Sequence, residues 1–261
     1  MTTKLTNQDI LRIALEQSAY DCNCRPEDFL LSENIITTSQ RHPRARKYLP
    51  LPFACDLVSY GSNIVAQTSE EVAPLVRDYL SKFPVEHCFE TPNLHVLDQM
   101  LLKHSLKTCF MAEYFLPDIG SLTPLPCQYE LRMMEQRDFV GLYLPEWSNA
   151  LCEPRKELDA LGVGAYDGDR LIALAACSAD CESMYQIGVD VLPSYRRQGI
   201  ASALTSRLAL EILSCGKVPF YCAAWCNIKS VRNAIRCGFR PAWVELTARE
   251  QSFVDKMNRT F

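Results

Sequence analysis

The sequence predicts an α/β protein built in two parts, and three observations support this. Strand-like and helix-like runs alternate along most of the 261 residues. Eight of the ten glycines follow residue 140, where they mark turns between short strand-like runs. The segment Pro117 to Gln128 concentrates Pro, Gly, Ser and Thr, as linkers do. We therefore expect an N-terminal α/β domain of unknown role over residues 1–125 and a second domain over residues 126–261.

The composition is that of an ordinary soluble protein, with 48% hydrophobic and 22% charged residues. A formal net charge of -4 argues against a dedicated nucleic-acid binder, which usually carries a basic excess. No apolar run approaches the roughly 18 residues of a membrane span, and the N-terminus resembles an amphipathic helix more than a signal peptide. We expect a cytoplasmic location, with neither nucleic acid nor membrane as a partner.

The thirteen cysteines are odd in number and dispersed, so we expect reduced thiols that pack as small hydrophobic side chains. Close pairs such as Cys177 and Cys181 do not reproduce the paired spacing of a structural zinc site. The sequence therefore predicts no metal site.

The first half mixes helical and strand patterns without recognisable chemistry. Helices are expected around residues 7–17, 25–30, 69–83 and 94–106, and strands within residues 53–68 and 107–116. The basic run over residues 41–50 contains two prolines and is interpreted as a solvated loop.

In the second half, predicted short strands, turns and helices alternate more regularly than in the first. Strands are expected at residues 128–134, 184–192, 218–225 and 239–248, with a hairpin over residues 162–178 that turns at Gly168. Helical segments are expected at residues 135–143, 154–161 and 199–214, and after Asn227, which is a good helix N-cap.

The strand-to-helix junction from Val189 to Leu204 has the composition of a phosphate-binding turn. A helix that begins at Gly199 offers unpaired N–H groups and the positive end of its dipole, and both attract phosphate. Gly199 leaves the backbone accessible, and Arg196 and Arg197 add donors that carry charge. The sequence has neither the Gly-Lys-Ser/Thr of nucleotide triphosphatases nor a three-glycine dinucleotide turn.

Arg196, Gly199 and Ala201 resemble the Arg/Gln-x-x-Gly-x-Gly/Ala signature of the GNAT acyltransferase superfamily. The strand "VDVLP" before them and the segment "NIKSVRNAIRCGF" after them follow the order of that superfamily, and the resemblance covers roughly Tyr129 to Arg249. The whole chain is similar to two-part bacterial GNAT N-acetyltransferases. The resemblance implies a C-terminal GNAT fold, with a mixed, mostly antiparallel central sheet flanked by helices.

The resemblance also implies acetyl-CoA, or another acyl-CoA, as donor, with its pantetheine arm in a gap between two splayed strands. Backbone groups of Val189 and Val191 would bind that arm, and Asn227 would contact it. The cofactor-binding residues implied in this way are Val189, Val191, Arg196, Arg197, Gln198, Gly199, Ile200, Ala201, Ser202 and Asn227.

The catalytic groups depart from the family pattern. Many GNAT enzymes place a tyrosine acid seven residues after the capping asparagine, and that position is Ala234 here. Tyr185 as acid or relay and Glu182 as a base acting through water are the expected substitutes, with Asp180 as an alternative to Glu182. A thiolate also leaves at neutral pH without an acid, since a thiol pKa is about 8.5.

The predicted function is an N-acetyltransferase that moves an acetyl group from acetyl-CoA to an amine by direct attack. The acceptor is a small-molecule or peptide amine, and the N-terminal half covers the acceptor or forms a homodimer. Two alternatives stay open: an acyl-CoA-binding regulatory or interaction module without catalysis, favoured by Ala234, and a binder of another phosphate ligand.

Overall fold

The computed structural model describes residues 5–259, which form two compact units. Unit 1 combines the N-terminal residues through Ile13 with Phe115–Pro241, and unit 2 combines Ala14–Tyr114 with the chain from Ala242 onward. Three elements run from one unit into the other: helix α1 (Asn7–Cys22) and strands β4 (Leu106–Pro117) and β10 (Phe239–Glu250). The domain boundary near residue 125 stays a prediction.

Unit 1 contains a mixed sheet in the strand order β9-β8-β7-β6-β5. The strands are β5 (Glu130–Glu135), β6 (Asp159–Asp167), β7 (Arg170–Ser178), β8 (Met184–Val191) and β9 (Val218–Ala224). Neighbours from β5 to β8 pair antiparallel, and β8 pairs with β9 in parallel. The predicted mixed, mostly antiparallel α/β fold is therefore confirmed.

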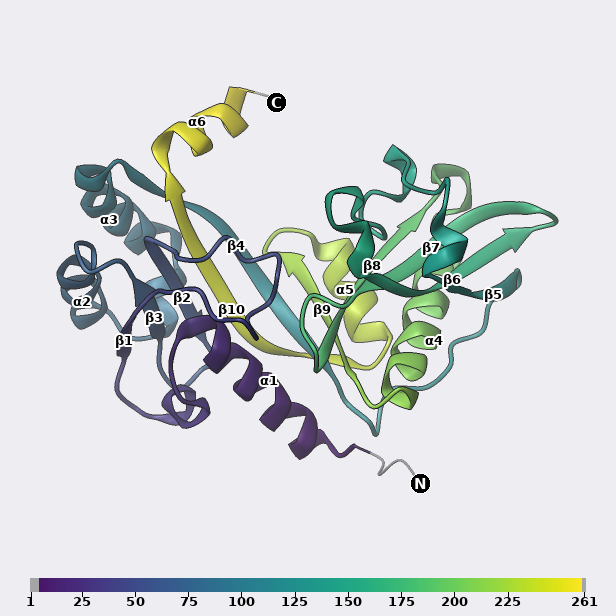
Figure 1. The fold of residues 1–261 in the computed structure, drawn as a ribbon, viewed down its shortest axis with the longest axis horizontal. Coiled ribbons are helices and arrows are strands. Elements are labelled where there is room, and N and C mark those ends of the chain that lie inside the picture. The colour runs from purple at the N-terminus through teal and green to yellow at the C-terminus, as the bar shows by residue number, and fades with distance from the viewer. Residues whose placement is uncertain (1–4, 260–261) are drawn as a thin grey trace. The chain divides into compact units, whose positions relative to one another are not determined.

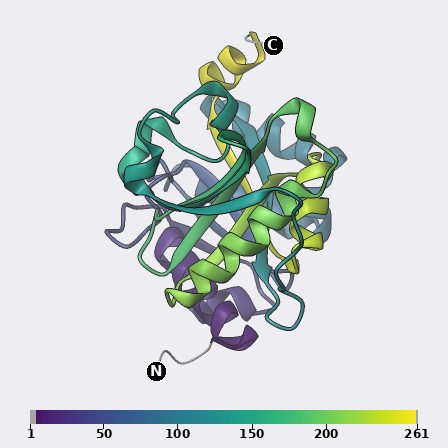
Figure 2. The same cartoon turned by 90° about the vertical axis from the view of Figure 1, so that its right-hand side faces the viewer.

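Helix α4 (Ile200–Ser214) covers one face of this sheet, as Figure 2 shows. Its apolar residues recur three and four positions apart, so they share one side of the helix. Leu204 and Leu208 are fully buried there against Val163 and Ile187 from the strands. On the other face, Leu174 of β7 packs in a separate core with residues of the segment between β5 and β6. Burial on both faces fixes the position of β7, and β8, the strand that ends at the predicted phosphate-binding turn, pairs with β7 along most of its length.

Strands β8 and β9 part before β8 ends. Their parallel register begins at Met184 and Val218 and stops at Ile187 and Tyr221. Strand β8 continues to Val191, where it still pairs with Ala173 of β7. The two strands diverge in Figure 1, and α5 (Ile228–Arg236) follows β9. The chain thus forms a fork that is closed at Ile187 and Tyr221.

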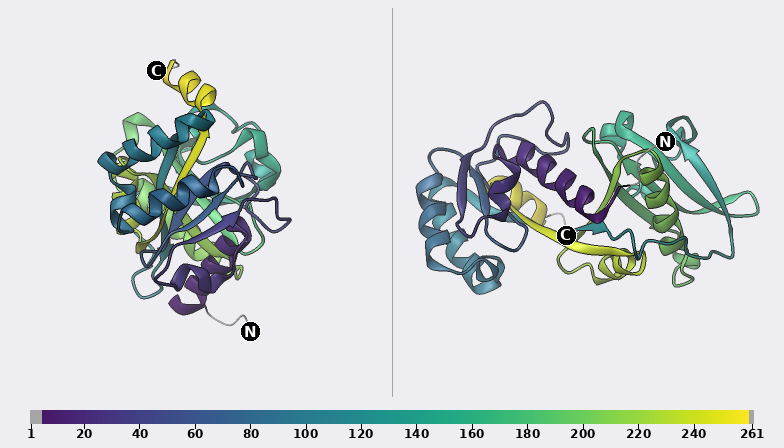
Figure 3. Two further views of the ribbon diagram at one scale, coloured as in Figure 1. Left: turned by 90° about the vertical axis from the view of Figure 1, so that its left-hand side faces the viewer. Right: turned by 90° about the horizontal axis from the view of Figure 1, so that it is seen from below.

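Unit 2 has a sheet in the order β1-β3-β2-β10-β4, to which β4 and β10 contribute their portions in this unit. The strands β1 (Ile35–Thr38), β2 (Cys55–Ser59) and β3 (Val65–Thr68) join helices α2 (Ala73–Lys82), α3 (Thr91–Leu101) and α6 (Gln251–Arg259). Helices α2 and α3 contact each other, as the left view of Figure 3 shows, and bury Val76 and Leu97 in a common core.

Several segments expected as helices form only short 3-10 turns. These turns are Pro26–Leu30, Leu102–His104, Gln136–Phe139 and Glu153–Leu158. Three further 3-10 turns lie where no helix was expected: Glu86–Phe89, Pro145–Trp147 and Pro193–Tyr195. The expectations of longer helical segments at 135–143 and 154–161 were wrong in type. The segment between β5 and β6 instead forms separate short turns that bury Phe139, Trp147 and Leu151 in one core, and β6 already begins at Asp159. Within residues 5–259, every helix is too short or too polar to cross a lipid bilayer.

Candidate active site

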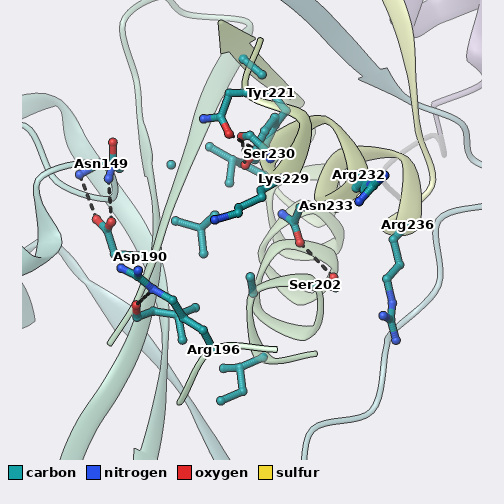
Figure 4. Close-up of a pocket in the computed structure, with 18 of the residues that line it drawn as sticks. Asn149, Asp190, Arg196, Ser202, Tyr221, Lys229, Ser230, Arg232, Asn233 and Arg236 are labelled. Carbon is teal, nitrogen blue, oxygen red and sulfur yellow. Dashed lines mark hydrogen bonds between the residues drawn. The ribbon is translucent and has the colours of Figure 1, made fainter. Parts of the chain in front are cut away.

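The fork between β8 and β9 opens into a cavity of about 800 Å³ in unit 1. Figure 4 shows its labelled side chains, which come from β8, the turn between β8 and α4, α4, β9, α5 and the segment before β6. The lining residues are Asn149, Gln186 to Val191, Tyr195 to Arg197, Gly199 to Ser202, Tyr221 to Ala224, Asn227, Lys229, Ser230, Arg232, Asn233 and Arg236. The cavity is therefore formed where the sheet is locally incomplete.

The last residues of β8 direct part of their backbone into this cavity. The N–H of Leu192 donates to the carbonyl oxygen of Ile172 on β7, at 3.0 Å. Because peptide groups alternate sides along a strand, the groups of Val189 and Val191 face away from β7. The Arg196 Nε donates to the Val191 oxygen at 3.0 Å, and Val189 lies beyond the register with β9. An extended ligand can therefore pair with Val189 as an added strand would.

Gly199 forms the N-cap of α4 in a left-handed conformation, with φ of +79°. No side chain caps this helix, so its first-turn amides are left for another acceptor. A Cβ built on Gly199 would meet only Arg236 Nη2, at 3.9 Å, and Arg197 also has positive φ, at +67°. The turn is open and rich in donors, which fits a phosphate group at this position.

Nine of the ten sequence-predicted cofactor residues line the cavity. They are Val189, Val191, Arg196, Arg197, Gly199, Ile200, Ala201, Ser202 and Asn227. Gln198 does not, since its Oε1 accepts hydrogen bonds from Gln128 Nε2 at 2.6 Å and from the Tyr129 hydroxyl at 3.0 Å. Asn227 is the expected helix cap, with its side chain accepting from the Ser230 N–H at 3.3 Å. Their contacts with a cofactor stay predictions.

The cavity is strongly cationic. Arg196 and Arg197 extend from the turn, and Lys229, Arg232 and Arg236 come from α5. None of these five side chains forms a salt bridge with a residue in the range 5–259. The three α5 cations were missed from the sequence, although their spacing of three and four places them on one helical face. Their spacing in the helix predicted after Asn227 could have identified them as a cationic face.

Asp190 is the one carboxylate among the described lining residues, and it is held by a neighbouring loop. Its oxygens accept from the Asn149 N–H at 2.8 Å, the Asn149 Nδ2 at 2.7 Å and the Ala150 N–H at 3.0 Å. A Cβ on Gly188 would lie 1.8 Å from the Asn149 oxygen, so only glycine permits this approach. Asp190 therefore attaches this loop to β8.

Tyr221 stands at the closed end of the fork. Its ring is buried, and its hydroxyl lies 2.8 Å from Ser230 Oγ on α5. Burial raises the pKa of Tyr221, against the effect of its hydrogen bonds with Ser230 and Asn233. The phenol therefore stays protonated over the neutral range. Ala234 is fully buried in the same core as Tyr221 and presents no polar atom.

The two residues predicted as catalytic lie outside the lining of the cavity. Tyr185 precedes the point of divergence, opposite Pro219 in the β8–β9 register, and burial raises its pKa. Glu182 is exposed before β8, and its backbone oxygen accepts from Lys217 Nζ at 2.8 Å. Asp180 is buried and paired with Arg155. The catalytic roles of Tyr185 and Glu182 stay predictions, with no support from this geometry.

A family model for GNAT acetyltransferase matches residues 103–242, more than half of the chain. The match includes every residue that lines the cavity. This chain belongs to the GNAT acetyltransferase family. The predicted superfamily is therefore confirmed, and the predicted enzyme class, acyltransferase, is the class of this family.

Several solved structures are similar to this chain at low identity. A GNAT-family acetyltransferase from Colwellia psychrerythraea is 16% identical, with a TM-score of 0.44, over 61% of this chain and 63% of its own, so less than two thirds of its length is spanned. A Drosophila protein is 12% identical, with a TM-score of 0.45, over 94% of this chain and 90% of its own. The yncA structure from Salmonella typhimurium, with its cofactor acetyl-CoA, is 17% identical, with a TM-score of 0.36, over 48% of this chain and 95% of its own.

A comparison with curated proteins gives no match. In the part of the chain that the structure describes, no group of three or more His, Cys, Asp or Glu side chains is arranged to hold a metal ion.

Proposed function

We propose that this protein transfers an acetyl group from acetyl-CoA to an amine. The observation that carries this proposal is the cavity at the β8–β9 fork, which ends in the Arg196 to Ser202 turn. The turn supplies amides, a helix dipole and two guanidinium groups for a diphosphate. The free edge of β8 at Val189 supplies backbone partners for the arm that follows. Family membership supports the same donor.

The direction of the donor follows from this arrangement. With its phosphates at the turn, an extended arm that runs along β8 ends near Ile187 and Tyr221, where the fork closes. The distance is covered by about five residues of strand, roughly 16 Å. The thioester end therefore lies beside Tyr221.

We propose that Tyr221 is the proton donor in place of the tyrosine missing at Ala234. The amine nitrogen bonds to the acetyl carbon, the carbon–sulfur bond breaks, and the Tyr221 hydroxyl gives its proton to the departing sulfur. The proton lost by the amine passes to water, and water restores the phenol. A raised pKa suits this role because it keeps the proton on Tyr221 until the thiolate forms.

Direct attack is favoured over an acetyl-cysteine intermediate. Cys222 lines the cavity and accepts from Gln186 Nε2 at 3.0 Å, but no histidine is among the described lining residues. A cysteine nucleophile needs a base or a cation pair to form its thiolate. We expect Cys222→Ala to keep at least a third of the wild-type turnover. Complete loss of turnover with CoA binding intact, or an acetylated Cys222 in mass spectra, would favour the covalent route.

The acceptor is proposed to be a small-molecule or peptide amine, and the location to be the cytoplasm. The decisive experiment follows label from radioactive acetyl-CoA into a panel of polyamines, aminoglycosides, amino acids and peptides, alongside calorimetry with CoA. Transfer to any amine supports the proposal. CoA binding without transfer supports a binding module, which Ala234 and the occupied Asp190 carboxylate favour. Absence of CoA binding would contradict both functions.

A further inference from the structure

Helix α5 carries three cations on the face that borders the cavity: Lys229, Arg232 and Arg236. Their spacing of three and four residues matches the 3.6-residue helical repeat, so they form one row. All three are exposed, and none is held by a carboxylate within residues 5–259. A row of unneutralised cations beside a ligand cavity is suited to an anionic group of that ligand.

The cavity holds more positive charge than a diphosphate requires. A diphosphate carries about two negative charges, which Arg196, Arg197 and the start of α4 can match. The Asp190 carboxylate does not offset the α5 row, because its oxygens are occupied by Asn149 and Ala150. Three cations are left over, enough for a further phosphate monoester, which carries about -1.5 to -2 at neutral pH.

The row is continuous with the diphosphate turn. Arg236 Nη2 lies 3.9 Å from the position that a Cβ of Gly199 would take. Figure 4 shows the Arg236 side chain extending away from α5, past Ser202 of α4. Asn233, within the row, is tied to α4 by hydrogen bonds with Ser202 at 2.9 Å and Thr205 at 3.1 Å. An anion bound at the Arg236 end of the row would therefore lie next to the diphosphate. Lys229 lies at the other end, because it precedes Ser230, whose Oγ is 2.8 Å from the Tyr221 hydroxyl.

We propose that Arg232 and Arg236 bind the 3′-phosphate of the CoA donor and make the site selective for CoA over dephospho-CoA. This inference rests on the proposed function. It assigns these two arginines of α5 to the donor and leaves the acceptor to the part of the cavity near Asn149.

The test compares CoA with dephospho-CoA by calorimetry at one fixed salt concentration. The proteins are the wild type, the double variant Arg232→Gln/Arg236→Gln, and Arg207→Gln as a matched control. Arg207 is an exposed arginine of α4 that does not line the cavity. Thermal unfolding of each variant reports whether it is folded. If the double variant does not fold, the single variant Arg236→Gln replaces it in the comparison.

We expect the wild type and the control to bind CoA at least tenfold more tightly than dephospho-CoA, and the double variant to prefer it less than threefold. Equal wild-type affinities for the two ligands would overturn the inference and leave the proposed function intact. The inference would also be overturned if the double variant lost affinity for CoA and for dephospho-CoA by the same factor. The two arginines would then attract both ligands through their long-range charge and would not contact the 3′-phosphate. Failure of the wild type to bind either ligand would overturn the proposed function, and the inference with it.

Discussion

The proposed function gives separable roles to single residues at the two ends of the cavity. Tyr221 lies at the closed end of the fork, and Gly199 lies in the turn that we propose binds the diphosphate. A change at Tyr221 should alter turnover, whereas a change at Gly199 should alter donor affinity.

Tyr221→Phe removes one hydroxyl and keeps the buried ring. We expect kcat to fall at least about tenfold, less than the roughly 100-fold or more typical of general acids, because a thiolate is already a fair leaving group. The KM for acetyl-CoA should change less than threefold. Steady-state kinetics checks this, with Tyr79→Phe as control, since the buried Tyr79 of unit 2 is not among the lining residues and its hydroxyl donates to the Cys88 oxygen at 2.8 Å. An unchanged kcat in Tyr221→Phe would remove this tyrosine from the mechanism.

Gly199→Glu places a side chain and a negative charge at the N-terminus of α4. We expect the Kd for CoA to rise at least tenfold, because the carboxylate occupies the anion position. Gly141→Glu is a matched control: Gly141 has φ of +84°, is exposed, and is not in the cavity lining. Both variants should lose about 1 kcal/mol of stability from a side chain at positive φ. Equal CoA affinities of the two variants, measured by calorimetry, would contradict the assignment of the turn.

At the scale of elements, the loop at Asn149 can approach β8 only because residue 188 is a glycine, which has no side chain. Gly188→Ala would put a Cβ 1.8 Å from the Asn149 oxygen, so strand or loop must move. We expect a loss of about 2–3 kcal/mol in the free energy of unfolding, as for overpacked cores. Gly120→Ala, whose nearest contact would be an ordinary 3.6 Å, should change stability by less than about 0.5 kcal/mol. Denaturant unfolding measures the stability of both variants. Equal stabilities would show that the loop at Asn149 moves away from β8 at no measurable cost in free energy.

The sequence predicted the elements around the cavity and most residues of the turn at Gly199, but it did not predict the contributions of Asn149, Tyr221 and the α5 cations. Strands β8 and β9 and helices α4 and α5 follow from periodicity and from the signals at Gly199 and Asn227, which act within a few residues. Asn149 could not be predicted, because its contact with Asp190 joins positions about 40 residues apart. The position of Tyr221 at the fork depends on where β8 and β9 separate, and no local pattern encodes that point. The glycine at 188 signals a close approach without identifying the partner.

At the scale of the whole molecule, unit 2 contains a buried charge cluster that should make stability depend on pH. Arg46 is buried with Asp21, at 2.5 Å, and with Glu245, at 3.5 Å, and Gln67 Nε2 donates to Asp56 at 2.9 Å. Burial raises the pKa of Asp56 and of Glu245, and the nearby Glu245 carboxylate raises that of Asp56 further. One guanidinium does not balance three carboxylates, so the cluster favours protonation.

A carboxyl group with a raised folded-state pKa stabilises the fold while it is protonated. Its contribution is therefore fully present below its ordinary pKa, 3.8 for Asp56, and is lost as the pH rises through the raised pKa of the folded state. We expect Asp56→Asn to increase the free energy of unfolding at pH 8 by the order of 1 kcal/mol and to flatten its decline between pH 5 and 8. Parallel pH profiles of wild type and variant, from denaturant unfolding, would show that Asp56 is ionised in the folded protein.

The chain passes between the two units inside α1, β4 and β10, not in loops. Each unit consequently combines two stretches that are far apart in the sequence, and cleavage of a single peptide bond cannot separate either unit intact. Grafting a different unit 2 onto the GNAT core would require three junctions, each within regular secondary structure. Diversification of such a scaffold is therefore easier by point substitution along the cavity wall than by exchange of entire modules.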